Sequence, residues 1–453
     1  MVRSIWLFGL RTRHLIALVL SSSYSVDALM HYTSIDDGRT DRYFDGDEFS
    51  RRARELDNEQ YRQLTNFSFL SCGIARFLAS FVILRINNKY LLLGSTVAEV
   101  ALCCASSSIY GSYGAEGLNY LYLSLIFVQQ FRFPLALNIL SKWSSPYQMT
   151  FCFGLFQASR LFLRTIAIKI IDSLLARGYS SVFSGIYLGC GVKCLFFVLW
   201  FLLGAADPYA SLIASESEKE EIRKFYPRRL KVELSSCPPW KQILKMPELY
   251  AFVVGEIGNY WCYRYESSRF MDPVIIPKYR DSVTVLAAYY LYLVVALINA
   301  AVVDFLIKIE FSSVNNIRKT ASTVTAWGCA VCLLMYGYNC DSMWEDVWLG
   351  VFLVFKIANF LNQQTLNVHS VSPTYCGFIY SIISSLAFFS MIGLPHIEKF
   401  FLSRKQKQNL MYLIGFLLFF TNMLMTMIGD LDVKDFDTYG TVKWKDESLL
   451  SYP

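Results

Sequence analysis

Residues 206–248, ADPYASLIASESEKEEIRKFYPRRLKVELSSCPPWKQILKMPE, form a polar stretch between two long apolar parts of the chain. The stretch carries eight Lys/Arg and seven Asp/Glu in 43 residues. Apolar residues dominate up to Leu203 and resume at Leu249. Because the apolar parts are of similar size, we interpret 206–248 as a cytoplasmic linker between two helical bundles. A loop between two helices of one bundle is the alternative.

The composition indicates a membrane protein. Of the 453 residues, 54% are hydrophobic and only 17% are charged, whereas in soluble domains about a quarter of all residues are charged. The apolar residues come in blocks of about 20, the length a helix needs to cross the hydrocarbon core. The net charge of +6 is typical of proteins that collect Lys/Arg in cytoplasmic loops. We therefore expect an all-α polytopic protein in a lipid bilayer, with no nucleic-acid partner.

Twelve apolar segments are long enough to span a bilayer, six before the linker and six after it. They run over residues 14–34, 64–84, 90–110, 119–140, 148–171, 183–205, 249–270, 284–307, 321–338, 346–368, 376–396 and 409–429. The predicted domains are a six-helix bundle at 1–205, the linker at 206–248, a second six-helix bundle at 249–429 and a tail at 430–453. Twelve helices in this 6+6 arrangement are typical of major facilitator transporters, whose site lies between the two halves near the midplane.

Lys and Arg residues in the short loops predict the orientation. Most of them fall on the linker side if both termini are cytoplasmic: Arg3, Arg11, Arg13, Arg85, Lys89, Lys142, Arg318 and Lys319. The basic loop from Lys399 to Lys407 falls on the other side and disagrees. We expect cytoplasmic termini in a plasma, vesicle or lysosomal membrane.

Several short stretches, in order along the chain, resemble one known family. They are Phe133-Pro134 with Ser141–Pro146, Gly178–Phe183, Asp207-Pro208 with Glu216–Ile222, Pro239–Pro247, Asp304–Leu306, Ile317–Lys319 and Asn367–Tyr375. The chain resembles the anion:cation symporters of the major facilitator superfamily, the group of sodium-phosphate cotransporters, sialin and vesicular glutamate transporters. The resemblance implies a carrier that moves a small organic or inorganic anion with H⁺ or Na⁺ by alternating access.

The departures from this family concern its charged residues. Gln129 occupies the position of the symporters' coupling Glu, and Tyr122 occupies the position of their helix-four Arg. His31 aligns with the first-helix Arg, and Asn259 with the helix-seven Arg. These losses leave open an alternative: a transporter-fold protein that no longer transports and acts as a sensor or structural partner.

Several cations lie within the predicted spans, where each costs about 2.5–3.5 kcal/mol unless it faces a cavity or a partner. Arg132 and Arg160 sit deep, and an Arg can bind a carboxylate or phosphate in a fork. We predict both as substrate-binding residues, together with Asn259 and Tyr263. For each Arg, and for the equally deep Arg76, we weigh a cavity or an ion pair against a structural tie, and an interfacial position is the alternative for Tyr263.

Coupling to protons requires a titratable group at membrane depth. Glu256 lies beside Asn259, in a span that lines the cavity in this fold, and the missing Arg removes a cation that would hold its carboxylate ionised. We predict Glu256 as the main coupling residue and His31 as a second. The alternatives are an ion pair for Glu256 and a packing role for His31. Glu99 ranks last, because its span usually packs at the periphery.

One motif points to an enzyme. His31 and Asp36 fit the His-x4-Asp pattern of glycerolipid acyltransferases, in which the Asp orients a His base. Those enzymes do not have twelve spans with such a linker, so we do not expect an enzyme. The sequence has no Walker phosphate-binding loop and no Cys pairs repeated at zinc-site spacing, so no metal or other cofactor is predicted.

Overall fold

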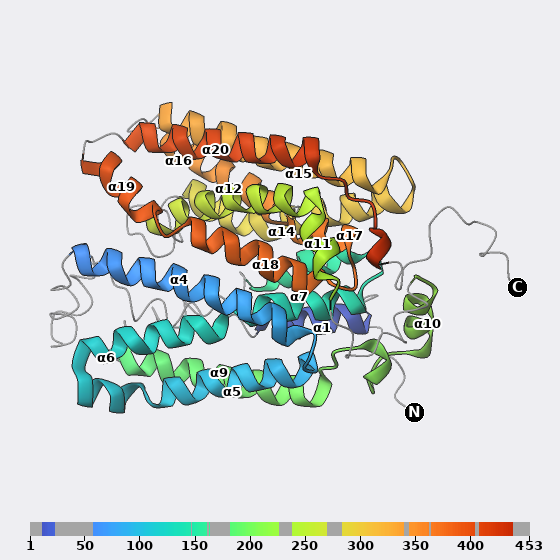
Figure 1. Cartoon of the computed structure of the whole chain (residues 1–453), viewed down its shortest axis with the longest axis horizontal. Coiled ribbons are helices and arrows are strands. Elements are labelled where there is room, and N and C mark those ends of the chain that lie inside the picture. The colour runs from blue at the N-terminus through green and yellow to red at the C-terminus, as the bar shows by residue number, and fades with distance from the viewer. Residues whose placement is uncertain are drawn as a thin grey trace, which may run out of the picture.

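The computed structural model describes residues 11–22, 58–145, 147–160, 163, 182–225, 238–269, 283–338, 344–361, 364–403 and 407–437. Within these ranges the regular elements are all helices. Figure 1 shows the helices of the first half, in blue and green, on one side of a long molecule and those of the second half, in yellow to red, on the other.

The first half consists of helices that run roughly parallel to the long axis (Figure 1). They are α1 (Thr12–Ser22), α4 (Asn58–Ile83), α5 (Asn88–Cys104), α6 (Ser106–Gln129), α7 (Arg132–Trp143), a helix over residues 149–160, and α9 (Val182–Leu203).

The second half begins after the linker and has a similar plan. Its helices are α12 (Pro247–Arg269), α14 (Val283–Lys308), α15 (Val314–Tyr338), α16 (Glu345–Leu361), α17 (Gln364–Val371), α18 (Cys376–Ser390), α19 (Leu394–Ser403) and α20 (Lys407–Ile428).

The described part of the linker contains the short helix η1 (Pro208–Ala210), α10 (Glu216–Phe225) and α11 (Trp240–Lys245), and η3 (Asp435–Asp437) follows α20. In Figure 1, α10 lies at the end of the molecule nearest the labels of α1, α11 and α17. We call this the linker end.

Among the described residues, six helical segments are long and apolar enough to cross a membrane. They are Gln63–Ile83, Glu116–Trp143, Ile186–Leu203, Val314–Tyr338, Cys376–Phe401 and Gln408–Ile428. A seventh is the pair Asn88–Cys104 and Ser106–Gly114, which is bent by 46°. Each of these seven falls on one of the predicted spans.

One predicted span is bent in the structure, and another contains a short turn within a continuous span. The segment 90–110 is not one straight helix, because α5 ends at Cys104 and the chain bends at Ala105. Gly114, inside α6, has φ 61° and ψ −146°, a conformation that glycine adopts without the steric cost a side chain would bring. The segment 119–140 is divided between α6 and α7, with Pro134 in the first turn of α7, where its missing N–H costs little.

The two halves meet along α18, which packs against α4 and α7 of the first half. A Cβ added to Gly377 would lie 2.8 Å from the Pro134 carbonyl oxygen and 2.7 Å from Asn138 Cβ. The hydroxyl of Ser385 donates to the Gly73 carbonyl at 2.7 Å. Small residues thus bring the helices close together, as is common between membrane helices. We call this contact the α18 seam.

Candidate functional site

Glu256 lies on α12 and is completely buried. Its Oε1 accepts a hydrogen bond from the Tyr380 hydroxyl at 2.8 Å, and its Oε2 accepts one from Asn259 Nδ2 at 3.5 Å. Tyr380 belongs to α18, and its ring lies 5.3 Å from that of Phe133 in the first half. The carboxylate is therefore one side chain away from the α18 seam.

A row of buried amides continues from Glu256 into the second half. Asn359 of α16 donates to Asn259 Oδ1 at 3.0 Å, and Thr325 of α15 donates to Asn359 Oδ1 at 3.4 Å. The Asn259 side chain thus connects Glu256 to Asn359. Its assignment to substrate binding stays a prediction.

Arg76 approaches this row from α4 in the first half. Its Nε donates to Gln130 Oε1 at 3.1 Å. Its guanidinium carbon lies 5.2 Å from the Phe133 ring centroid and 5.8 Å from that of Phe388, a geometry in which a cation is attracted to an aromatic face. The Phe133 ring also lies 5.3 Å from that of Tyr380, so Arg76 and Tyr380 share this neighbour.

Tyr260 completes the group. Its ring packs at 4.8 Å from that of Phe388, the same ring that lies 5.8 Å from the Arg76 guanidinium carbon. We call Arg76, Glu256, Asn259, Tyr260 and Tyr380 the central polar cluster. It brings one cation from the first half and one carboxylate from the second half to the same place.

Arg132 lies elsewhere, inside the first half. It forms an ion pair with Glu99 of α5, which also pairs with Lys193 of α9. All three side chains are at most 1% exposed. Arg132 is thus in a buried ion pair, one of the environments considered for it. A substrate-binding role for Arg132 stays a prediction.

The structure says less about the other predicted site residues. Arg160 is half-buried near the end of the helix over 149–160. Tyr263 belongs to α12, but its side chain lies outside the described residues, as does the whole of His31. The sequence reasoning missed Tyr380 and Gln130, because a single Tyr or Gln in an apolar span carries no distinguishing pattern.

The two halves are also joined at the linker end. Asp304 of α14 accepts the backbone N–H of Thr150 at 3.2 Å and that of Phe151 at 2.7 Å. These groups belong to the first turn of the helix over 149–160, where a carboxylate satisfies unpaired donors and complements the helix dipole. On the α18 side, Trp240 of α11 packs against Phe81 at 5.6 Å and Phe378 at 4.7 Å between ring centroids.

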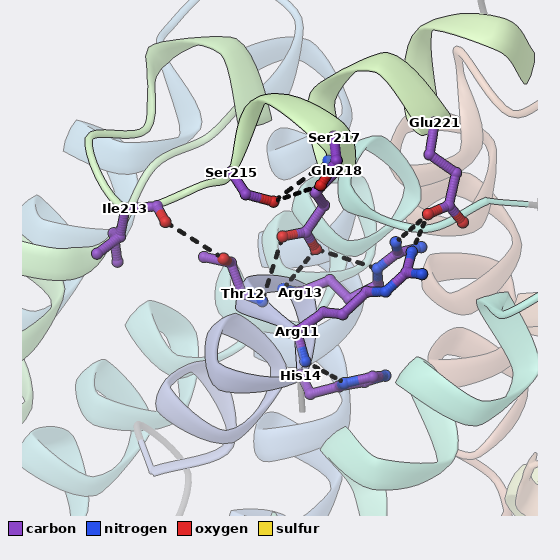
Figure 2. Close-up of polar contacts among 9 residues, drawn as sticks. All are labelled: Arg11, Thr12, Arg13, His14, Ile213, Ser215, Ser217, Glu218 and Glu221. Atoms are coloured by element: carbon purple, nitrogen blue, oxygen red, sulfur yellow. Dashed lines mark hydrogen bonds and ion pairs between the residues drawn. The ribbon is translucent and has the colours of Figure 1, made fainter. Parts of the chain in front are cut away.

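The linker is tied to the start of the first helix by charges, as Figure 2 shows. Glu218 of α10 accepts from Arg13 Nε and from the Arg13 backbone N–H, both at 3.1 Å. Glu221 accepts from Arg13 Nη2 at 3.0 Å and also pairs with Arg11. We call Arg11, Arg13, Glu218 and Glu221 the linker clasp.

Among the described residues, no group of three or more His, Cys, Asp or Glu side chains could hold a metal ion.

Comparison with known proteins places this geometry in a known fold. No protein-family model and no curated protein sequence matches the chain. Solved structures do match. The major facilitator superfamily proton:xylose symporter XylE, bound to 6-bromo-6-deoxy-D-glucose, has a TM-score of 0.67 at 9% identity, covering 92% of this chain and 95% of its own. The fucose:proton symporter FucP of E. coli has a TM-score of 0.63 at 9% identity, covering 93% and 99%.

The prediction of a major facilitator fold is thereby confirmed. The TM-scores establish the shared fold. Because the identities are only 9–10%, the anion:cation symporter resemblance stays a prediction.

Proposed function

We propose that this chain is a secondary active transporter, which moves a small solute across a bilayer by alternating access and couples that movement to protons. The observation that carries the proposal is Glu256, a buried carboxylate beside the α18 seam that hydrogen-bonds to Tyr380. An ionisable group at this depth is costly and usually functional. The similar structures XylE and FucP are named as proton symporters, which supports proton coupling over Na⁺.

Alternating access requires the two halves to rock about a central site. The central polar cluster draws residues from both halves, so such rocking would change the distance between Arg76 and Glu256. The Asp304 contacts and the Trp240 packing hold the linker end together in this structure, and both would have to open for release on that side. We propose that this side is cytoplasmic, as the Lys/Arg distribution predicts.

For the solute we propose a small anion. Arg76 offers a buried guanidinium near the seam, and Arg160 adds a second cation to the first half. Pairing of Arg132 with Glu99 reduces the number of cations open to a solute. Because XylE and FucP are named for xylose and fucose, a neutral sugar is the second candidate.

The test is uptake into proteoliposomes that contain the purified chain. The solutes are phosphate, glutamate, sialic acid, urate, xylose and fucose, each with and without an inward proton gradient. We expect gradient-driven uptake of at least one anion, lost in Glu256→Gln and kept in Glu216→Gln, which changes an exposed linker carboxylate. Gradient-driven uptake that survives Glu256→Gln would assign coupling to another group.

The family charges missing at Gln129, Tyr122 and Asn259 support the other class of function, a sensor or structural partner with a transporter fold. Under that alternative, none of the six solutes would enter the vesicles although the protein is folded and correctly inserted.

A further inference from the structure

Helices α5 and α9 of the first half pack directly against each other, and two contacts fix their register (Figure 1). Lys193 of α9 forms a buried ion pair with Glu99 of α5. Further from the linker end, the Tyr187 hydroxyl of α9 hydrogen-bonds to Ser107 Oγ, just past the end of α5, at 3.0 Å. The residue numbers rise along one helix as they fall along the other, so the two helices are antiparallel.

Two cysteines lie between these contacts, one on each helix. Cys103 comes four residues after the carboxylate of the ion pair and four before the serine of the hydrogen bond. Cys190 lies three residues from the contact residue on either side of it in α9. Positions three or four apart share one face of a helix, so the register places the two thiols opposite each other. Cys103 is 0% exposed and Cys190 is 7% exposed, as side chains inside a helix contact should be.

We propose that Cys103 and Cys190 form a redox-active thiol pair, which a peroxide oxidises to a disulfide between α5 and α9. Both are thiols in this structure. One thiol is oxidised by hydrogen peroxide to a sulfenic acid, and one water is released. The second thiol then displaces the sulfenic oxygen as another water, and the S–S bond forms. The two sulfurs together lose two electrons, which the peroxide takes up.

The position of the pair in the first half suits this chemistry. Cys104 and Cys194, beside the pair on the same two helices, are exposed, so the buried thiols lie just beneath the surface and a small neutral peroxide can reach them. At the linker end, Lys89 Nζ donates to the Phe201 carbonyl at 2.9 Å. Cys103 lies 14 residues further along, which corresponds to about 21 Å of helix. With the linker end cytoplasmic, as proposed, the pair lies toward the other face of the membrane, where disulfides persist.

The disulfide would stabilise the first half without blocking alternating access. Both helices belong to this half, so the bond does not cross the α18 seam. It would hold α5 to α9 one turn away from the buried ion pairs of Glu99. A disulfide that closes a long loop stabilises mainly by constraining the unfolded chain. The inference goes beyond the proposed function, because a redox-dependent stability requires neither a solute nor a coupling group.

The experiment is disulfide mapping of the purified full chain in micelles, before and after treatment with hydrogen peroxide. The remaining thiols are blocked, the protein is digested with trypsin without reduction, and the peptides are identified by mass spectrometry. Cleavage after Lys193 separates Cys190 from Cys194. We expect a linked peptide pair that contains Cys103 and Cys190 and that dithiothreitol separates. The unfolding temperature should rise on oxidation by about 5 °C or more.

Four variants locate the bond. Cys103→Ala and Cys190→Ala should each abolish both the linked peptide and the rise in unfolding temperature. Cys104→Ala and Cys194→Ala, which change the neighbouring exposed thiols, should keep both. A link that is lost in Cys104→Ala and kept in Cys103→Ala would overturn the proposed pair. Absence of a peptide that links α5 to α9 in the oxidised wild type would overturn the proposal outright. The wild-type map needs no variant to fold and no solute to be transported, so its outcome is independent of the uptake assay.

Discussion

The carboxylate of Asp304, in the second half, accepts the backbone N–H of Phe151, in the first half, at 2.7 Å. Asp304 is 6% exposed and also accepts from the Thr150 N–H. A side chain of one half thus caps a helix of the other. Under the proposed function, rocking of the halves breaks this cap, so the cap stabilises the arrangement in which the linker end is closed.

Replacement of Asp304 by Ala should open the linker end more often. Loss of a helix N-cap costs about 1 kcal/mol, which corresponds to about a fivefold shift of the equilibrium. Cys152 is completely buried next to Phe151, so its rate of maleimide labelling, followed by mass spectrometry, reports the opening. The control is Asp207→Ala, which removes a carboxylate cap from Tyr209 within the linker. Equal Cys152 labelling in Asp304→Ala and the wild type would contradict a closing role.

Replacement of Glu99 by Gln should destabilise the first half strongly. Arg132 and Lys193 would stay buried without their carboxylate, and a buried pair that loses one partner typically costs about 3–5 kcal/mol. The measurement is the unfolding free energy in mixed micelles. The control is Glu216→Gln, whose pair with Lys219 is 83% exposed on the Glu side and is worth about 0–1 kcal/mol. Similar losses of unfolding free energy in both variants would mean that the buried ion pairs of Glu99 contribute little to stability.

The helical fold could be predicted from the sequence because its signal is local. A span of about 20 apolar residues must satisfy its own backbone in a bilayer, so its position depends on nearby residues alone. The breaks in the helices were harder to predict from the sequence. The turn at Gly114 depends on the backbone conformation, which a single glycine in an apolar stretch does not reveal.

The candidate site was predictable only in part. Glu256 could be identified because a carboxylate at membrane depth is rare. Its partner Tyr380 is 124 residues away, and the choice of partner depends on how α12 packs against α18. For the same reason Arg132 and Glu99 were both recognised as embedded charges, but their pairing was not.

The segment after α20 should stay attached to the second half over a wide pH range. Lys434 donates to Glu248 Oε1 at 2.7 Å and to Asp430 Oδ2 at 3.1 Å. Burial lowers the pKa of Lys434, but Glu248 and Asp430 outweigh this and raise it above 10.5. Burial likewise raises the pKa of Asp430, and Lys434 outweighs this and lowers it below 3.8.

The Lys434 contribution is present below pH 10.5 and is lost as the pH rises through its raised pKa. The Asp430 contribution is present above pH 3.8 and is lost as the pH falls through its lowered pKa. Hydrogen-exchange protection of residues 430–437 should therefore be constant between about pH 5 and 9. Lys434→Met should reduce it throughout this range, while Lys308→Met, at an exposed position, should not. Protection that changes within this range in the wild type would contradict the assignment.

The linker clasp should behave as one coupled unit. Arg13 is 0% exposed and Glu218 is 3% exposed, so Arg13→Met leaves a buried carboxylate whose charge is no longer compensated. Glu218→Gln still offers an acceptor to the backbone N–H groups of Thr12 and Arg13, and Arg13 keeps Glu221. We therefore expect the Gln variant to lose less stability than the Met variant. The double variant should lose less stability than the two single variants together, by about 0.5–3 kcal/mol, the range of coupling between residues in contact.

Arg11 is 34% exposed, so Arg11→Met serves as the control and should cost no more than about 1 kcal/mol. The measurement is the unfolding free energy of each variant in micelles, and strictly additive losses for Arg13 and Glu218 would show that the clasp does not act as a unit.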